Sequence, residues 1–337
     1  MSNPVLTDAI DRVAAGHDLD TAEAAHVLRE VMEGNASESE IAGFLIALRT
    51  KGETVQEIAG LASTMRDLAL PVRVAGDLVD TAGTGGGRPT FNVSTTAAFI
   101  AAGAGCRVAK HGNRSATSQC GSADVLEALG ARIDLEPDAV AACIEAVGFG
   151  FMLAPKHHAA TRHVVPVRKA LGVRTIFNFL GPLTNPAGAR RQVIGVSDPA
   201  KLETLALALA ELGAESALVV SSADGLDEFS VAGTTHVVEL RDGSLTTYDV
   251  SAEELGIEPA GDGAVAAGTP DRNAQVLRDV LAGKPGTERS LAVLNAAAAI
   301  YVGGQAESLE AGVQRAEAAI DDGSATRVLD GYLEQAR

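Results

Sequence analysis

Aromatic residues are scarce in this sequence: they make up 3% of its 337 residues, and tryptophan is absent. Proteins that bind single-stranded nucleic acid stack its bases on aromatic side chains, and this sequence has few such side chains to offer. Positive charge is also in the minority, because 27 Lys and Arg residues face 44 Asp and Glu residues, a formal net charge of −17. Such an acidic surface repels nucleic acid and anionic lipid, so an anionic ligand would need a local cationic pocket.

Cysteine is also rare, and the three cysteines, Cys106, Cys120 and Cys143, show no CxxC spacing. An odd, irregular set fits neither a disulfide framework nor a zinc site, and it is typical of a reducing cytoplasm. Long apolar runs are lacking too, since the longest, near 294–302, is too short and too rich in alanine to span a bilayer. Residues 1–13 are polar and acidic, without a signal-peptide pattern. We therefore expect a cytoplasmic, globular protein that binds neither membranes nor nucleic acid.

Two patterns divide the chain, whose length suits one large or two ordinary domains. The first seventy residues indicate helices only, with capping boxes that begin at Asp20, Ser37 and Thr54. From Asp77 onward, β-rich runs alternate with helical stretches, which is typical of a mainly parallel sheet flanked by helices. The expected strands include 78–80, 106–109, 149–153, 192–196 and 216–220, and a hairpin over 236–250 turns at Asp242-Gly243.

These patterns predict an α/β protein in which a small all-helical domain is joined to a larger domain with a mainly parallel sheet. We place the helical domain at 1–71, joined by helices from about 160–185, and the α/β domain at 76–158 and 188–337. The helical domain has few polar side chains that could converge, so its expected uses are packing and dimerisation.

The first candidate site is a glycine-rich turn after the strand at 78–80. Four of the five residues 83–87 are glycine, so backbone amides can be exposed without obstruction by Cβ atoms. A helix expected to start near 92–95 adds unpaired amides and the positive end of a helix dipole. Arg88 breaks the dinucleotide pattern GxGxxG, and no Gly-Lys-Ser follows to make a P-loop. A flexible turn is the alternative, but strand, glycines, hydroxyls and helix in this order favour phosphate binding.

The second candidate, 110–118, follows the expected strand at 106–109, so it would lie at the carboxyl edge of the sheet, where such folds bind ligands. Lys110 and Arg114 supply positive charge, and an arginine fork can hold two phosphate oxygens. The alternative is a solvated basic loop. It is disfavoured because two cations, a histidine and several hydroxyl and amide groups gather in nine residues of an acidic protein.

The third candidate is the acidic loop 224–228, just after the strand at 216–220. Adjacent carboxylates at a strand end can hold Mg²⁺ together with water and substrate oxygens. Alone, an exposed acidic loop would be the simpler interpretation. Beside two phosphate cradles a cation site is favoured, because phosphate bound near carboxylates needs a bridging cation.

The fourth candidate segment carries His157, His158 and His163. Their spacing does not align them on one helix face, and no cysteine or acid joins them, which disfavours a metal site. Arg168 stands in a largely apolar helix. It could pair with a substrate carboxylate or form a surface salt bridge, and the sequence leaves these two interpretations evenly balanced.

Seven segments, in order along almost the whole chain, resemble the anthranilate phosphoribosyltransferase family. They are Gly83-Thr-Gly-Gly, Asn92-Val-Ser-Thr, Lys110-His-Gly-Asn-Arg-Ser, the stretch 121–130, Pro166-Val-Arg-Lys, Arg174-Thr-Ile-Phe-Asn-Phe-Leu-Gly-Pro-Leu-Thr-Asn-Pro and Gly225-Leu-Asp-Glu. The resemblance implies transfer of the phosphoribosyl group of phosphoribosyl pyrophosphate (PRPP) to the amine of anthranilate. The products are N-(5-phosphoribosyl)anthranilate and pyrophosphate, in tryptophan biosynthesis. It also implies a nucleoside-phosphorylase-like fold with a hinged helical domain, Mg²⁺ as cofactor, and a homodimer through the helical domain.

The resemblance further implies roles for individual residues. Its PRPP ligands would be Gly83, Gly86, Gly87, Thr90, Asn92, Val93, Ser94, Thr95, Lys110, His111, Gly112, Asn113, Arg114, Ser115, Ala116, Thr117, Ser118 and Ser122. Its anthranilate ligands would be Gly83, Asn113 and Arg168, the last through the carboxylate, and its metal ligands Ser94, Asp227 and Glu228. An aromatic amine is already neutral, so no general base is nominated, and His111 is expected to orient a group or relay a proton at most.

Two departures from the family pattern stand out. The usual Asp after Gly-Thr-Gly-Gly is Gly87 here, which predicts a looser loop and a different handling of a second Mg²⁺. The common His-Pro-Ala-Met is here His158-Ala-Ala-Thr161, which predicts a different entry to the anthranilate site.

Two other functions are compatible with parts of this pattern. A related phosphoribosyltransferase or nucleoside phosphorylase with another acceptor would use the same phosphate loops, but a pyrimidine has no carboxylate for Arg168. A non-enzymatic binding module with this fold should lack the metal carboxylates, whereas Asp227 and Glu228 are present.

Overall fold

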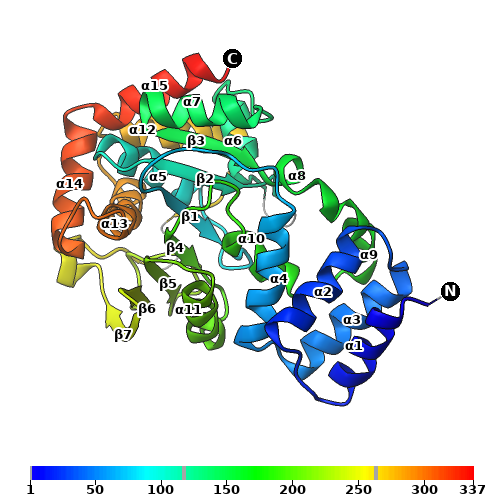
Figure 1. The fold of residues 1–337 in the computed structure, drawn as a ribbon. Helices are drawn as coiled ribbons and strands as arrows, with labels where there is room; N and C mark the ends of the chain where they lie inside the picture. The colour runs from blue at the N-terminus through cyan, green and yellow to red at the C-terminus, as the bar shows by residue number, and fades with distance from the viewer. Residues whose placement is uncertain (1, 116–118, 262–264) are drawn as a thin grey trace.

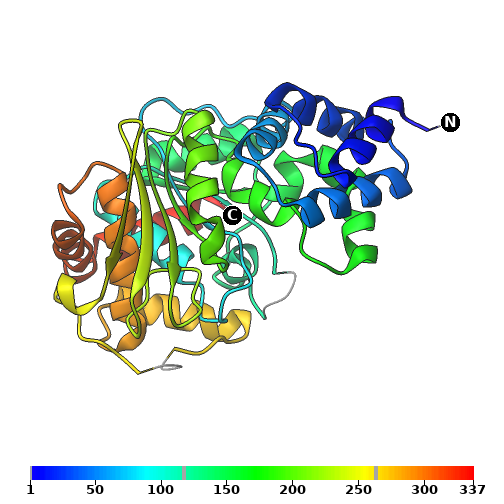
Figure 2. The ribbon, with the colours of Figure 1, turned by 90° about the horizontal axis from the view of Figure 1, so that it is seen from below.

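The computed structural model describes residues 2–115, 119–261 and 265–337. An N-terminal helical bundle lies beside a larger part built around a sheet (Figures 1 and 2). None of the helices in these residues has the length and apolarity needed to cross a membrane. The predicted fold class, a helical domain with a larger α/β domain, is confirmed.

Residues 2–71 form the four helices of the bundle: α1 (Pro4–Ala14), α2 (Thr21–Met32), α3 (Glu38–Lys51) and α4 (Val55–Asp67). The three predicted capping boxes are confirmed. The side chains of Asp20, Ser37 and Thr54 each accept the backbone amide of a glutamate three residues later, and each glutamate bonds back to the capping residue. These bonds satisfy amides that the helix itself leaves unpaired, and they fix where each helix starts.

A later segment packs against this bundle. It contains α8 (Ala154–His157), the 3₁₀ helix η1 (Ala159–His163), α9 (Val165–Leu171) and α10 (Phe177–Leu183). The helix α9 contacts α3, η1 contacts α2, and α10 contacts α4. Buried side chains such as Val167 and Leu180 share one apolar core with the bundle. The domain boundaries expected from the sequence stay a prediction.

The sheet of the described residues has seven strands in the order β3-β2-β1-β4-β5-β6-β7. The first five pair in parallel, and the last two are antiparallel. The Asp242-Gly243 turn predicted between β6 and β7 is confirmed, and both residues have positive φ, as a tight hairpin requires. The strands are β1 (Val79–Gly83), β2 (Val108–Gly112), β3 (Phe149–Leu153), β4 (Arg191–Gly195), β5 (Ser216–Ser222), β6 (Thr235–Arg241) and β7 (Ser244–Val250).

Helices cover both faces of the sheet. On β5, Leu218 and Val220 belong to the core beneath α5 and α13, whereas Ala217 and Val219 belong to the core beneath α11 and the bundle. This alternation is what a strand buried on both faces requires. The remaining elements are α5 (Val93–Gly103), α6 (Ser122–Ala128), α7 (Pro137–Val147), η2 (Pro199–Lys201), α11 (Leu202–Glu211), η3 (Glu253–Leu255), α12 (Pro270–Leu281), α13 (Thr287–Val302), α14 (Leu309–Asp321) and α15 (Ser324–Gln335).

Candidate active site

The order of the strands creates a crevice at one edge of the sheet. The strand β1 lies between β2 and β4. After β1 the chain passes to α5 in one core, and after β4 it passes to α11 in the other core. Chains that leave neighbouring parallel strands toward opposite faces open a crevice beyond the carboxyl ends, where ligands bind in α/β folds. The glycine turn starts in this crevice.

The glycine turn is held at both of its ends. At its start, the Thr84 amide donates to the Gly195 carbonyl at 2.8 Å. At its end, the Arg88 amide donates to the Gly225 carbonyl at 2.7 Å, and the Arg88 side chain pairs with Asp224 at 2.6 Å. Gly85 and Gly86 have φ of 64° and 92°, which side chains rarely adopt. The turn is therefore an anchored structure, which argues against the flexible-turn interpretation.

The acidic loop packs directly beneath this turn. A Cβ atom built on Gly83 would lie 3.2 Å from Asp227 Oδ2, and the Gly85 amide stabilises the charged Asp227 carboxylate. The Asp227 backbone also fills the space that a side chain on Gly195 would need. Burial nevertheless raises the pKa of Asp227 above its ordinary value. The first and third candidate loops therefore meet, as a shared site requires.

Glu228 lies deeper in the same site. Its pKa is raised well above its usual range, first by burial and then by the neighbouring Asp227 charge, whereas Lys110 and the Ser94 amide lower it. Among the described residues its Oε2 atom is buried without a hydrogen-bond partner. Two adjacent carboxylates, a hydroxyl at Ser94 and an unsatisfied carboxylate oxygen are a donor set that suits a hard cation such as Mg²⁺.

The sequence predicts Lys110 in a loop, but this prediction is wrong. The strand β2 extends to Gly112 rather than ending at 109, so Lys110 lies within it. Its side chain is 1% exposed, and its ammonium donates to the Thr81 carbonyl and to Ser94 Oγ at 3.2 Å. Burial lowers its pKa to about 8, although the charges of Asp80 and Glu228 oppose this. Lys110 therefore lies between the glycine turn's strand, the α5 N-terminus and the acidic loop.

The buried carboxylate of Asp80 lies close to Lys110, His111 and Asn185. Its carboxylate accepts the His111 amide at 3.1 Å and the Asn185 side-chain amide at 2.8 Å. Burial raises the pKa of Asp80 to about 6, and Lys110 is the largest influence that lowers it. Sequence reasoning named neither Asp80 nor Asn185 as a site residue, although both fall in segments that it singled out.

The α5 N-terminus supplies further amides, as expected. Asn92 precedes the helix without capping it through its side chain, which instead contacts the Cys120 carbonyl at 3.2 Å and Asn273 at 2.9 Å. Val93 and Thr95 are fully buried, and the Val93 amide donates to the Phe91 carbonyl at 2.7 Å. Thr90 donates its hydroxyl to the Phe91 carbonyl at 2.9 Å.

The loop after β2 is placed less favourably for phosphate. The Arg114 guanidinium pairs with Asp124 at 2.9 Å and Glu127 at 2.8 Å, and these carboxylates raise its pKa. Asn113 is exposed and accepts the Arg114 amide, whereas Ser115 donates its amide to Asp124. Ser122 starts α6, and Gly112 lies against it. The expected ligands Ala116, Thr117 and Ser118 lie outside the described residues.

Two histidines and an arginine lie on the bundle side of the crevice. The His111 ring is 5.1 Å from that of His158, and its Nδ1 lies 3.1 Å from the Gly181 carbonyl. Burial lowers the pKa of His111 to about 3 and that of His158 to about 4, so both are neutral near pH 7. Arg168 lies 5.5 Å from the Phe177 ring centre, and burial lowers its pKa without any carboxylate of the described residues opposing the shift. This favours the ligand interpretation of Arg168 over the salt bridge.

Arg174 also reaches the site, and sequence reasoning did not name it. It donates to the Gly85 carbonyl at 2.7 Å and to the Thr84 carbonyl at 3.3 Å. The only sequence signal for it is its place at the head of the stretch 174–186. Among the residues described, no three His, Cys, Asp or Glu side chains form a group that could hold a metal ion.

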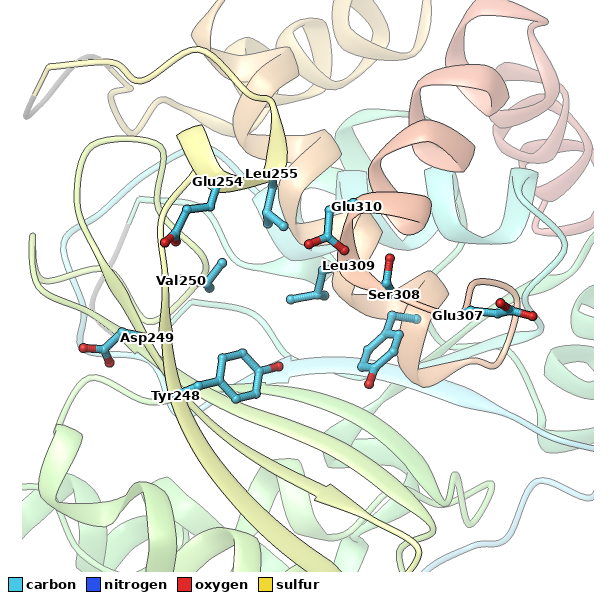
Figure 3. Close-up of a pocket in the computed structure, with 10 residues that line it drawn as sticks. Tyr248, Asp249, Val250, Glu254, Leu255, Glu307, Ser308, Leu309 and Glu310 are labelled. Atoms are coloured by element: carbon cyan, nitrogen blue, oxygen red, sulfur yellow. The ribbon is translucent and has the colours of Figure 1, made fainter.

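A cavity of about 420 Å³ lies elsewhere, between β7, η3 and α14 (Figure 3). Its lining includes Asp249, Glu254, Glu307 and Glu310 together with Tyr248. These carboxylates would repel a diphosphate, so this cavity does not suit a polyanionic substrate.

Known proteins resemble this chain over its full length. The model of the glycosyl transferase family a/b domain matches residues 75–326, and that of its helical bundle domain matches residues 7–69. A protein of Rubrobacter xylanophilus named anthranilate phosphoribosyltransferase is 50% identical, covering 99% of this chain and 98% of its own length. One from Methylococcus capsulatus is 48% identical, with 98% of each chain covered.

Solved structures agree with these sequences. An anthranilate phosphoribosyltransferase from Thermus thermophilus has a TM-score of 0.92 and 43% identity, covering 98% of this chain and 99% of that one. One from Saccharomyces cerevisiae, in complex with PRPP and Mg, has a TM-score of 0.90 and 27% identity, covering 99% and 98%. The chain belongs to the anthranilate phosphoribosyltransferase family.

Proposed function

We propose that this protein transfers the phosphoribosyl group of PRPP to the amine of anthranilate and releases pyrophosphate, a step of tryptophan biosynthesis. The observation that carries the proposal is the meeting of three chain segments at one sheet edge. The glycine turn lies on Asp227, Lys110 bonds to Ser94, and Ser94 faces Glu228. Family membership supports the same reaction.

The proposed PRPP site comprises the glycine turn, the α5 N-terminus and the loop after β2. Its backbone amides would bind the pyrophosphate, because amides at a helix N-terminus and in a glycine turn favour anions. Ser94, Asp227 and Glu228 are the proposed Mg²⁺ ligands, and the Glu228 Oε2 atom, which has no partner in the described part of the chain, supports this choice. Mg²⁺ bound there would offset negative charge that develops on the leaving pyrophosphate.

The proposed anthranilate site lies between the loop after β2 and α9. Gly83, Asn113 and Arg168 are its ligands, with the Arg168 guanidinium on the carboxylate. Burial alone lowers the pKa of Arg168, and no carboxylate of the described residues offsets this shift, which supports this role.

The residues present account for the chemistry without a strong base. Cleavage of the bond from ribose C1 to pyrophosphate creates positive charge on the sugar and negative charge on the leaving group. Lys110 and the amides of the turn would stabilise the latter. Anthranilate's amine attacks as a neutral nucleophile, so its positioning by Arg168 contributes most. His111 stays neutral because burial lowers its pKa to about 3, so it orients a group rather than serving as a base.

The test is direct. Protein, Mg²⁺, PRPP and anthranilate are mixed, and the loss of anthranilate fluorescence is followed, against a background without tryptophan. Omission of PRPP is the control for photobleaching. Persistent anthranilate fluorescence in the complete mixture, with folded protein, would refute the proposal.

We also propose that the protein is a cytoplasmic homodimer that associates through the helical bundle. Four of the five large apolar side chains that are exposed in the described residues, Ile46, Leu70, Val165 and Val173, lie on the bundle or on the segment that packs against it. Sedimentation equilibrium would show twice the chain mass. A monomer at micromolar concentration would contradict this assembly.

A further inference from the structure

Arg174 lies between α9 and α10, on the segment that packs against the bundle, yet its guanidinium binds the glycine turn of the sheet domain. Its Nη1 donates to the Gly85 carbonyl at 2.7 Å and its Nη2 to the Thr84 carbonyl at 3.3 Å. The Ser197 hydroxyl donates to the same Gly85 carbonyl at 3.1 Å. Two consecutive carbonyl groups of the turn are therefore held from one side.

Holding these carbonyls also orients two amides. The Thr84 carbonyl and the Gly85 amide belong to one planar trans peptide, as do the Gly85 carbonyl and the Gly86 amide, so each N–H points opposite to its C=O. The Gly85 amide accordingly points away from Arg174 and stabilises the Asp227 carboxylate, whose pKa the Arg174 charge also lowers. Among the described residues the Gly86 amide has no hydrogen-bond partner. Together with the Gly87 amide, which likewise has no partner among the described residues, it is an amide of the turn that can bind an anion.

The turn and the arginine also fit each other sterically. A Cβ atom on Gly86 would overlap Nη1 of Arg174, so the guanidinium occupies the space that a side chain there would take. The φ of 92° at Gly86 independently favours glycine. The guanidinium in turn lies 5.9 Å from the Phe179 ring centre, which restricts its own orientation.

We propose that Arg174 is a positioning residue for PRPP, which holds the turn by its carbonyls so that the Gly86 amide faces the pyrophosphate. Arg174 and Arg168 stand six residues apart on one segment. We call the contacts of Arg174 with the Thr84 and Gly85 carbonyls the clamp. The clamp joins the segment that carries the proposed anthranilate ligand to the glycine turn. This role rests on the proposed function, since it needs a pyrophosphate-bearing substrate at the turn.

The test compares Arg174→Ala, Arg174→Lys and a control, Arg190→Ala, which removes an arginine with an exposed ion pair to Glu215 at the other end of β4. Loss of charged hydrogen bonds should raise KM for PRPP about tenfold or more in Arg174→Ala. KM for anthranilate and kcat should change far less. Arg174→Lys should recover part of the loss, because its ammonium reaches only one carbonyl. The control should behave as wild type.

A second readout needs no catalysis. Amide hydrogen exchange of the turn, 84–88, should accelerate in Arg174→Ala, while exchange in β5 stays as in wild type. The affinity for Mg²⁺-pyrophosphate, measured by calorimetry, should fall by a similar factor to the rise in KM. Gly86→Ala should show a defect at least as large, because it displaces the guanidinium and also strains a turn whose φ of 92° favours glycine, and the double variant should be no worse than Gly86→Ala alone.

The outcomes separate this role from the proposed function. A wild type that binds Mg²⁺-pyrophosphate without turnover would refute the function and leave the clamp to be judged by exchange and binding. Unchanged exchange and unchanged KM for PRPP in Arg174→Ala would overturn the clamp alone. Additive losses in Gly86→Ala with Arg174→Ala would overturn it too, since they would mean that the two residues act separately.

Discussion

Gly87 lies so close to Asp227 that a Cβ atom built on the glycine would stand 2.5 Å from Asp227 Oδ1 and 2.7 Å from its backbone nitrogen. The sequence predicted a looser turn at this glycine. The structure shows instead a position where the turn packs on the acidic loop, and where a side chain would force them apart.

Any side chain at Gly87 should therefore weaken PRPP binding. We expect Gly87→Ala and Gly87→Asp each to raise KM for PRPP roughly tenfold, because both displace the turn from Asp227. Only Gly87→Asp adds a carboxylate, so only it should shift the Mg²⁺ concentration that gives half-maximal rate. Steady-state kinetics at varied Mg²⁺ measures both effects. Wild-type kinetics in Gly87→Ala would contradict the steric argument, and identical Mg²⁺ titrations in both variants would contradict the electrostatic one.

Arg168 should govern anthranilate binding. Replacement by alanine removes a half-buried guanidinium whose pKa no carboxylate of the described residues raises, so KM for anthranilate should rise about a hundredfold. KM for PRPP should change little. The exposed neighbour on the same helix, Lys169→Ala, is the matched control and should leave both constants unchanged. Equal rises in both constants would remove Arg168 from the anthranilate site.

Much of this fold follows from local signals. The capping boxes at Asp20, Ser37 and Thr54 start their helices, and the Asp242-Gly243 hairpin forms, because neighbouring residues settle such features. Strand ends are less local. The strand β2 runs to Gly112, past the polar Lys110 and His111, because their side chains find partners in Thr81, Ser94 and Gly181 that only the folded chain supplies.

In the candidate site, too, some features follow from local sequence and others depend on contacts that only the folded chain supplies. Glycine spacing and paired acids predicted which loops converge, since carboxyl ends of parallel strands share an edge. Arg174 was not predicted because it contacts backbone carbonyl groups, which leave no pattern in the sequence. Asp80 was not predicted because its partner Asn185 is 105 positions away. We expected Arg114 to bind phosphate, but it pairs with Asp124 and Glu127 on the adjacent helix. Composition does not reveal that these carboxylates compete with phosphate for the guanidinium.

The acidic loop should be dispensable for folding but required for turnover. Burial raises the pKa of both Asp227 and Glu228, and the Asp227 charge raises that of Glu228 further, so neutral amides at these positions remove a cost of burying charge. We expect Asp227→Asn with Glu228→Gln to keep or increase the thermal midpoint measured without Mg²⁺, and to lose the Mg²⁺-dependent rate by at least about a hundredfold. Full activity in that double variant would refute the metal assignment. A collapsed thermal midpoint would mean that these carboxylates are structural.

The buried histidines should make the protein sensitive to acid. The folded pKa of His111 is lowered to about 3 and that of His158 to about 4, by burial above all. Below the ordinary histidine pKa of about 6.5, the unfolded chain therefore binds protons that the folded chain does not bind. Stability should be full above that pKa and fall as the pH drops, by roughly 2 kcal/mol per ring between pH 7 and pH 5.

Urea unfolding at pH 7, 6 and 5 measures this loss. His158→Gln keeps a side-chain donor for the Thr184 carbonyl, which His158 Nε2 contacts at 3.0 Å, but cannot be protonated in this range. It should therefore remove one ring's share, roughly 2 kcal/mol, of the drop in unfolding free energy. His17→Gln, at an exposed histidine, is the control and should leave the drop intact. An equal fall in both variants would mean that acid destabilises this protein through other groups, such as its paired carboxylates.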